Sequence, residues 1–307
     1  ELARERPVLP EPSTAAPGGP YSILVTGIGG TGVLTVGALL GMAARLEGKG
    51  CSVLDNTGSA QKNGAVTSHV RILPAPGDEI AQRIGAGETD LVLGCDMVVA
   101  AGAPVLATVD AGRTRAVINR QVQPTSASVI DPDLDLAVSP LERAIATVVG
   151  EQRTDFVDAT VLATALLGDS IATNLFMVGY AFQKGLIPLS LAAIERAIEL
   201  NGVAVEANRS TLAWGRLAAH DPAHVADAAQ RRGEAQPPGV SGVPGGLAGT
   251  GAGGARALPE AGTGAVDATA AGESLRTLVE RRASMLADYH DAAYAARYRA
   301  LVEKVAD

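Results

Sequence analysis

The sequence predicts an α/β fold: a Rossmann-like, doubly wound and mostly parallel sheet with an inserted hairpin and a helical C-terminal part. Three observations support this prediction. Residues 22–45 form a β-branched run, a glycine loop and an apolar helix start. Further strand patterns alternate with short helical patterns. Aromatic residues are only 3% of the chain, so the core must consist mainly of Val, Leu, Ile and Ala, which suits helices packed closely on a sheet.

A glycine-rich loop connects the first strand to the first helix. Gly27, Gly29 and Gly32 match the spacing G-x-G-x-x-G, with Gly30 as an extra glycine and Thr31 before the last one. We expect Gly27 to permit the tight turn and Gly32 to let the helix pack on the strand. Gly29 and Gly30 would let the backbone approach a ligand, and the free N–H groups of the helix start would seat a phosphate. Such loops also occur in domains that bind nothing there.

A second strand is predicted over Cys51–Asp55, and it ends in a carboxylate. Asp55 stands 26 positions after Gly29, near where a dinucleotide-binding unit places the carboxylate that binds ribose. The alternative is that Asp55 caps a loop at the end of the strand. Taken alone, the loop and this carboxylate indicate a nicotinamide or flavin nucleotide.

The next segment, residues 61–72, departs from a dinucleotide-binding unit, which would continue into a helix. A turn at Asn63-Gly64 precedes strict alternation, which predicts an inserted hairpin strand. One face would carry Val66, Ser68, Val70 and Ile72, and the other Thr67, His69 and Arg71. We expect Lys62, His69 and Arg71 close to the carboxyl end of the sheet, where they could contact an anion. The alternative is a solvated polar face on an edge strand.

The remaining pattern alternates strands and helices. Strands are predicted over Asp90–Gly94, Arg115–Asn119 and Thr154–Asp158, and helices over Ile80–Ile84, Met97–Ala101, Pro104–Thr108, Leu141–Val149, Ala159–Leu167 and most of 170–219. Asn174, Asn201 and Asn208 lie in apolar helical stretches and are interpreted as structural hydrogen-bonding residues. Residues 131–142 imitate the acidic spacing of a calcium loop, but Leu136 occupies the position that requires glycine, so no metal site is predicted.

The composition divides the chain and limits its partners. We expect a linker over 1–20, a domain over 21–222, a Gly/Ala/Pro-rich flexible tether over 223–272 and the helical start of a further domain over 273–307. The net charge of −8 argues against nucleic-acid binding, and no membrane segment is predicted. The two cysteines, Cys51 and Cys95, read as buried thiols in a reducing, cytoplasmic compartment.

Four segments in register resemble the gamma-type domain of 2-oxoacid:ferredoxin oxidoreductases, most closely the fused indolepyruvate ferredoxin oxidoreductase type. They are GIGGTG, QKNGAVTSHVR, GDSIATNLFMVGYAFQKGLIP and AIELNGVAVEANRSTLAWGR, within residues 21–219. Asn63 departs from the family's usual QKGGAV, but Asn tolerates left-handed turns. The resemblance implies a larger homo-oligomeric enzyme that oxidatively decarboxylates an aryl 2-oxoacid to an acyl-CoA and reduces ferredoxin, using thiamine diphosphate and iron–sulfur clusters.

This chain has neither a thiamine-binding signature nor a cysteine set for a cluster. The resemblance therefore implies that it shapes the active site beside thiamine-binding and cluster-binding domains or subunits. The expected contacts to CoA or to the thiamine-bound intermediate are the backbone of Gly27, Gly29, Gly30, Thr31 and Gly32 and the side chains of Gln61, Lys62 and Arg71. No catalytic residue is assigned. Two alternatives stay open: an independent NAD- or FAD-dependent oxidoreductase, and a purely structural assembly domain.

Overall fold

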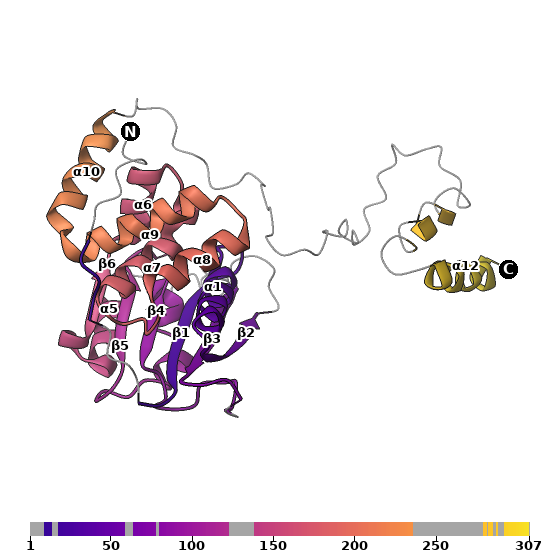
Figure 1. Cartoon of the computed structure of the whole chain (residues 1–307), viewed down its shortest axis with the longest axis horizontal. Helices are drawn as coiled ribbons and strands as arrows, with labels where there is room; N and C mark the ends of the chain where they lie inside the picture. The colour runs from indigo at the N-terminus through magenta and orange to yellow at the C-terminus, as the bar shows by residue number, and fades with distance from the viewer. Residues whose placement is uncertain are drawn as a thin grey trace. The chain divides into compact units, whose positions relative to one another are not determined.

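The computed structural model describes residues 9–13, 18–58, 64–77, 80–122, 138–235, 279–280, 282–284, 287 and 292–306. The chain divides into two units, Glu1–Ala252 and Gly253–Asp307. The first unit is an α/β fold whose sheet is covered by helices on both faces (Figure 1). The predicted fold class is confirmed.

The sheet has six strands in the order β2-β3-β1-β4-β5-β6. The strands are β1 (Tyr21–Ile28), β2 (Gly50–Thr57), β3 (Ala65–Leu73), β4 (Leu91–Gly94), β5 (Arg115–Asn119) and β6 (Thr154–Val157). β4 pairs in parallel with β1 and β5, and β6 pairs in parallel with β5. β3 is antiparallel to both of its neighbours, β1 and β2, so it is the inserted strand that the alternating pattern predicts.

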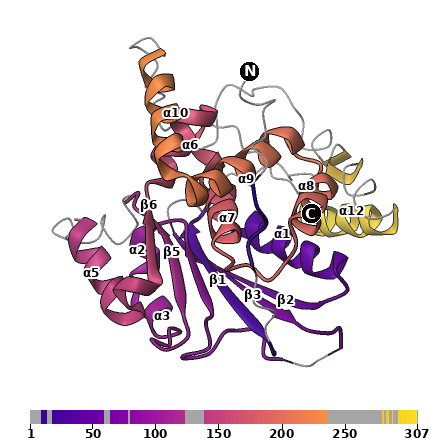
Figure 2. The same ribbon diagram turned by 60° about the vertical axis from the view of Figure 1, so that its left-hand side comes forward.

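The two faces of the sheet carry separate hydrophobic cores, and Figure 2 shows helices on either side of the sheet. Ile23 and Val25 of β1 pack toward the first face, and Leu24 between them packs toward the second. The first face is covered by α1 (Val33–Leu46), α7 (Thr173–Gln183), α8 (Leu191–Asn201) and α9 (Val205–His220), and the second by α2 (Met97–Ala100), α3 (Ala103–Leu106) and α5 (Val138–Val149). Each fully buried Ile, Leu or Val contributes about 1.5 to 3 kcal/mol.

The described part of the first unit also contains two short 3-10 turns and two further helices: η1 (Glu151–Arg153), η2 (Ser170–Ala172), α6 (Ala159–Leu167) and α10 (Pro222–Ala235). α10 lies where the sequence predicts the beginning of the tether, so that part of the tether prediction is wrong. Val225 and Ala228 are buried in the core of the first face. The rest of the expected tether, 236–272, and the acidic residues 131–137 lie outside the described residues.

The helix expected over Ile80–Ile84 is also absent, because the described residues of that segment are not helical. Their backbone groups bond to side chains of β3 instead. The N–H of Ile84 donates to Nδ1 of His69 at 3.2 Å, and the carbonyl of Ala81 accepts from Arg71 at 3.0 Å. The segment therefore covers the polar face of β3, which is consequently not solvated.

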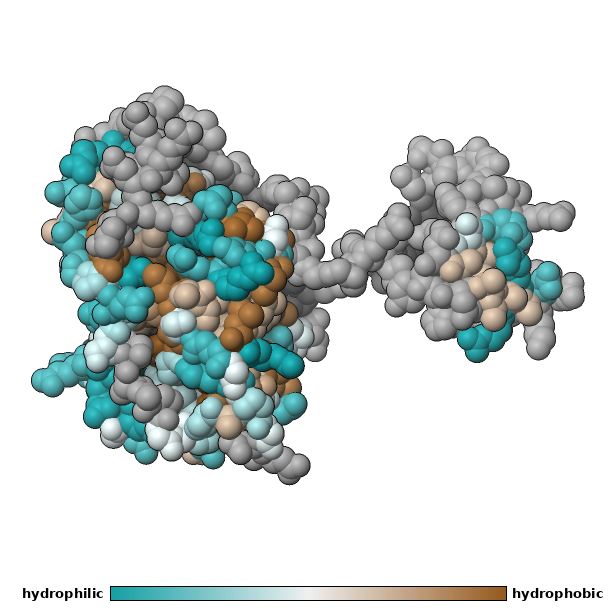
Figure 3. All heavy atoms as spheres, in the orientation of Figure 1, coloured by the Kyte–Doolittle hydropathy of each residue, from teal (hydrophilic) through white to brown (hydrophobic). Residues whose placement is uncertain are grey.

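The second unit is helical in its described part, which contains α12 (Ala292–Ala306). Ala283 and Ala295 are buried, and Arg299 forms an ion pair with Glu280 at 2.9 Å. On the face of the first unit seen in Figure 3, apolar residues are interspersed with polar ones. Within the described part of the chain, no helix is both long and apolar enough to cross a membrane.

Candidate functional site

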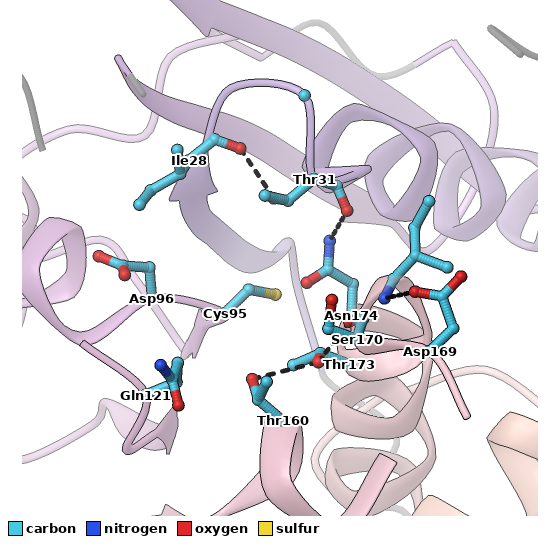
Figure 4. Close-up of a pocket in the computed structure, with 12 residues that line it drawn as sticks. Ile28, Thr31, Cys95, Asp96, Gln121, Thr160, Asp169, Ser170, Thr173 and Asn174 are labelled. Carbon is cyan, nitrogen blue, oxygen red and sulfur yellow. Dashed lines mark hydrogen bonds between the residues drawn. The ribbon is translucent and has the colours of Figure 1, made fainter. Parts of the chain in front are cut away.

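A pocket of about 250 Å³ opens at the carboxyl ends of β1 and β4 (Figure 4). β1 continues into α1 on the first face of the sheet, whereas β4 continues into α2 on the second. The pocket therefore lies at a topological switch point, the usual place for ligands in open α/β sheets. It is lined by Ile28, Gly30, Thr31, Cys95, Asp96, Gln121, Thr160, Asp169, Ser170, Ile171, Thr173 and Asn174.

The glycine loop forms one wall of this pocket. Gly30 and Gly32 have φ angles of 85° and 94°, whereas Thr31 between them does not have a positive φ. Alternation of this kind turns successive backbone N–H groups toward one side and makes a concave seat for an anion. Gly32 is the N-cap of α1 and offers no side-chain cap, so the first N–H groups of the helix lack acceptors within the helix.

In the structure, Gly27 has the packing role that was expected for Gly32, and Gly32 has the conformational role that was expected for Gly27. A Cβ at Gly27 would lie 2.6 Å from Cγ2 of Val33, so Gly27 allows the helix to start close to the strand. A Cβ at Gly32 would meet no atom closer than 3.6 Å, and glycine is needed there for the left-handed backbone. A Cβ at Gly30 would meet no atom of the described chain within 4 Å.

Four hydrogen bonds hold the loop, and one of them runs from the N–H of Thr31 to the carbonyl of Ile28 at 3.3 Å. The N–H of Gly29 donates to the carbonyl of Gly64 at 2.9 Å, at the end of the inserted hairpin. The Thr31 hydroxyl donates to the carbonyl of Ile28 at 2.7 Å. The amide Nδ2 of Asn174, in the first turn of α7, donates to the carbonyl of Thr31 at 2.8 Å. The loop is thus fixed both to its own hairpin and to a helix from a distant part of the chain.

The opposite wall is held by a chain of polar side chains. Asn119 at the end of β5 is 1% exposed, and its Nδ2 lies 3.0 Å from the carbonyl oxygen of Cys95 and 2.9 Å from the hydroxyl of Thr160. The hydroxyls of Thr160 and Thr173 are 3.2 Å apart. These bonds connect β5, α6 and α7, so the wall is shaped before any ligand arrives.

The charged groups at the pocket are acidic. Asp96 and Asp169 line it, and none of the described lining residues is Lys, Arg or His. Oδ1 of Asp96 accepts the N–H of Val99 at 2.9 Å and caps α2. Burial, followed by the nearby Asp96 charge, raises the pKa of the Cys95 thiol to about 12, so this thiol is protonated at neutral pH. An anion here would therefore bind through backbone N–H groups of the loop.

Arg71 does not lie near the glycine loop, and the expectation that it lies at the carboxyl end of the sheet is wrong. It pairs with Ser22, near the start of β1, whereas Ala65 pairs with Ile28 beside the loop. Six residue steps along β3 carry it about 20 Å away from that end. Arg71 is 6% exposed, and its guanidinium donates to the carbonyl of Ala81 at 3.0 Å and pairs with Glu88 at 3.0 Å.

The other predicted side chains do not meet at the pocket either. Gln61 and Lys62 lie outside the described residues. His69 pairs with Leu24 in the middle of the sheet, and burial, followed by the charges of Arg83 and Arg71, lowers its pKa. Its Nδ1 accepts a backbone N–H and its Nε2 lies 3.0 Å from the Asn56 amide. Both ring nitrogens thus have structural partners.

Asp55 is also separated from the loop. It lies on β2, where it pairs with Ser68 of β3, and β3 stands between β2 and β1. A dinucleotide-binding unit places its ribose carboxylate on the strand directly beside the first one. The inserted strand therefore removes Asp55 from the position that a ribose-binding role requires.

Several residues that line the pocket are not among the site residues predicted from the sequence. Cys95, Asp96 and Gln121 directly follow strands β4 and β5, a position that would have marked them as candidates. Asn174 was interpreted as structural because a single polar residue in an apolar helix gives no indication of which loop it will face.

The sequence model of the pyruvate ferredoxin/flavodoxin oxidoreductase family matches residues 22–217. The chain belongs to this family. It is 27% identical over 199 residues to the indolepyruvate oxidoreductase subunit IorB of Archaeoglobus fulgidus, spanning 63% of this chain and 92% of that subunit. It is 28% identical over 207 residues to the subunit of the same name from Pyrococcus horikoshii, spanning 66% and 96%.

Among solved structures, the pyruvate oxidoreductase subunit PORC of Thermotoga maritima is similar, with 20% identity and a TM-score of 0.46 over 64% of this chain and 95% of that one. The family resemblance carried by the four sequence segments is confirmed by the family match. The matched span runs from β1 to α9 and contains every residue that lines the pocket. The chain is therefore an oxidoreductase component whose pocket lies within the family domain.

Proposed function

We propose that this chain is the gamma-type component of an indolepyruvate-type 2-oxoacid:ferredoxin oxidoreductase, and that its pocket binds CoA beside the active site. The complete enzyme would decarboxylate an aryl 2-oxoacid, pass the electron pair to ferredoxin and transfer the acyl group to the CoA thiol. The observation that carries the CoA assignment is the glycine loop. Its alternating backbone and the uncapped start of α1 favour a phosphate-bearing ligand.

In this proposal, this chain holds neither the thiamine diphosphate nor the iron–sulfur clusters of the complete enzyme. Its two cysteines lie on β2 and directly after β4, too few for a thiolate-bound cluster. In the described part of the chain, no group of three or more His, Cys, Asp or Glu residues could hold a metal ion. In this proposal, other domains or subunits of the same enzyme supply both cofactors.

CoA is favoured over NAD or FAD by the placement of Asp55. A dinucleotide would need a carboxylate for its ribose beside β1, where β3 stands instead. The second wall offers hydrogen-bonding partners for the uncharged arm of CoA, because it presents the hydroxyls of Thr160 and Thr173. The carboxylates of Asp96 and Asp169 line the same pocket and would repel a phosphate placed beside them, so we expect the phosphates at the glycine loop.

The test is a matched pair of glycine substitutions in the assembled oxidoreductase. Gly30→Ala and Gly48→Ala both place a methyl group at a left-handed position, with φ of 85° and 71°, and neither Cβ would meet an atom of the described chain within 4 Å. Both carry the same backbone strain of about 1 to 2 kcal/mol. Gly30 lines the pocket, whereas Gly48 follows the C-terminal end of α1.

We expect Gly30→Ala to raise KM for CoA about tenfold and to leave kcat at saturating CoA nearly unchanged, and Gly48→Ala to leave both unchanged. Equal KM values for the two variants would contradict the proposal. Calorimetric titration of the full chain with NAD and FAD tests the dinucleotide alternative, because micromolar binding that Gly30→Ala weakens would favour it. If Gly30→Ala impairs only assembly of the enzyme, the domain is structural.

A further inference from the structure

Asn174 provides the contact between the glycine loop and the opposite wall of the pocket. It is 6% exposed, and its Nδ2 donates to the carbonyl oxygen of Thr31 at 2.8 Å across a separation of 143 residues. Figure 4 shows the amide reaching from α7 to the loop, with its nitrogen toward that oxygen. The other three loop bonds end on the backbone carbonyls of Gly64 and Ile28. Within the part of the chain that the structure describes, Asn174 is the side chain from another element that anchors this loop.

The peptide bond between Thr31 and Gly32 is the part of the loop that Asn174 anchors. Glycine populates positive and negative φ about equally, so Gly32 by itself does little to prevent this peptide plane from turning over. In a planar trans peptide, the C=O and N–H groups point in opposite directions. The bond that fixes the Thr31 carbonyl toward α7 therefore also fixes the direction of the Gly32 N–H.

We propose that Asn174 is a positioning residue that prevents the Thr31–Gly32 peptide from flipping and so keeps the loop ready to accept an anion. Without this bond, the carbonyl oxygen could turn toward the side where a phosphate is expected, and its partial negative charge would replace an N–H donor there. The role in ligand binding rests on the proposed function. The role in loop conformation does not.

The test compares Asn174→Leu with Asn208→Leu. Both replace an amide by a side chain of similar size that cannot donate a hydrogen bond. Asn208 is a suitable control because its Nδ2 also donates to a backbone carbonyl, that of Val203, at 2.9 Å, and because it lies at the start of α9 away from the pocket lining. Should Asn174→Leu fail to fold, Asn174→Ala removes the same donor without adding an apolar group.

The first readout is hydrogen exchange of the backbone amides from Gly30 to Val33 in the ligand-free full chain. We expect faster exchange in Asn174→Leu and no change in Asn208→Leu. The second readout is KM for CoA in the assembled oxidoreductase. Asn174→Leu should raise it about tenfold at nearly constant kcat, which corresponds to about 1.4 kcal/mol, the usual order of one hydrogen bond.

The two readouts distinguish the role of Asn174 in loop conformation from its role in CoA binding. Unchanged exchange at Gly30 to Val33 in Asn174→Leu overturns the positioning role, even if CoA binds to the wild type. Faster exchange together with an unchanged KM supports the control of loop conformation and removes its link to CoA. Faster exchange in Asn174→Leu, together with a KM for CoA that Gly30→Ala does not change, leaves Asn174 as the loop anchor and counts against the proposed function.

Discussion

The crossing of α7 over α9 depends on two glycines, and substituting one of them should destabilise the first unit. A Cβ at Gly215 of α9 would overlap the carbonyl oxygen of Phe176, and a Cβ at Gly179 of α7 would overlap that of Leu212. Both obstacles are backbone atoms of a neighbouring helix, which cannot rotate away as the end of a side chain can. Gly215→Ala therefore forces the two helices apart.

The magnitude follows from two opposing terms. Alanine is favoured over glycine inside a helix by about 1 kcal/mol, so an unobstructed substitution would stabilise the protein. Overpacking a well-packed core costs about 1 to 3 kcal/mol and occasionally more, and a rigid backbone obstacle places this case at the upper end. We expect Gly215→Ala to lower the free energy of unfolding by about 2 kcal/mol or more.

The assay is urea denaturation followed by helical circular dichroism and by the fluorescence of Trp214, the single tryptophan of the chain. Gly41→Ala in α1 is the matched control, because its Cβ would lie 2.9 Å from Cγ2 of Val53, a methyl group on the edge strand that can move aside. It should change stability by less than about 1 kcal/mol. A Gly215→Ala protein as stable as the control would refute the argument from backbone contact.

Three further predictions follow from titratable or charged side chains. Because burial and two arginines lower the pKa of His69 in the fold, the unfolded chain takes up that proton first. The free energy of unfolding should fall by up to about 1.4 kcal/mol per pH unit below about pH 6.5, and His69→Gln should lessen this slope in denaturation at pH 5.5 and 7.5. Burial raises the pKa of Cys95 to about 12. Iodoacetamide at pH 7.5 should therefore modify Cys95 in urea but not in the folded chain. Rapid modification of Cys95 in the folded chain would show that the pocket opens. Arg71→Met should cost about 1 to 3 kcal/mol of stability, because it removes the hydrogen bonds from the buried guanidinium to the carbonyls of Ala81 and Arg83. It should leave KM for CoA unchanged because Arg71 lies at the far end of β3, and a raised KM would contradict that placement.

Local patterns predicted most elements well, because a strand or helix with a strong periodicity and clear ends needs little tertiary information. β5 and α6 have the predicted bounds, the first ending at polar residues and the second at Gly168. α10 was missed because it buries small residues such as Ala228 beside few large ones, which gives a weak apolar stripe. The helix expected over Ile80–Ile84 fails because side chains of β3 bond to the backbone of that segment.

The candidate site was predictable only where its chemistry is local. The spacing of the glycines indicated the loop, since the turn, the positive φ angles and the helix start lie within a few residues. The polar face of β3 was also assigned correctly, but alternation cannot say at which end of the sheet a residue lies. That depends on strand length and register, which placed Arg71 opposite Ser22. The second wall combines Asn119 of β5 with Thr160 and Thr173, whose proximity to the loop depends on how β5, α6 and α7 pack together.

The inserted strand explains why this pocket differs from a dinucleotide site that has a similar glycine loop. β3 occupies the place beside β1 and so moves Asp55 one strand further out. The same hairpin brings the Gly64 carbonyl to the N–H of Gly29 and supports the loop from that side. A loop supported in this way no longer has a ribose carboxylate next to it, so selectivity for a ligand has to come from the opposite side. That side is formed by α7, where Asn174 holds the loop and Thr173 continues the polar wall. In the proposed function, recognition therefore combines a backbone anion seat on one wall with hydroxyl and carboxylate groups on the other.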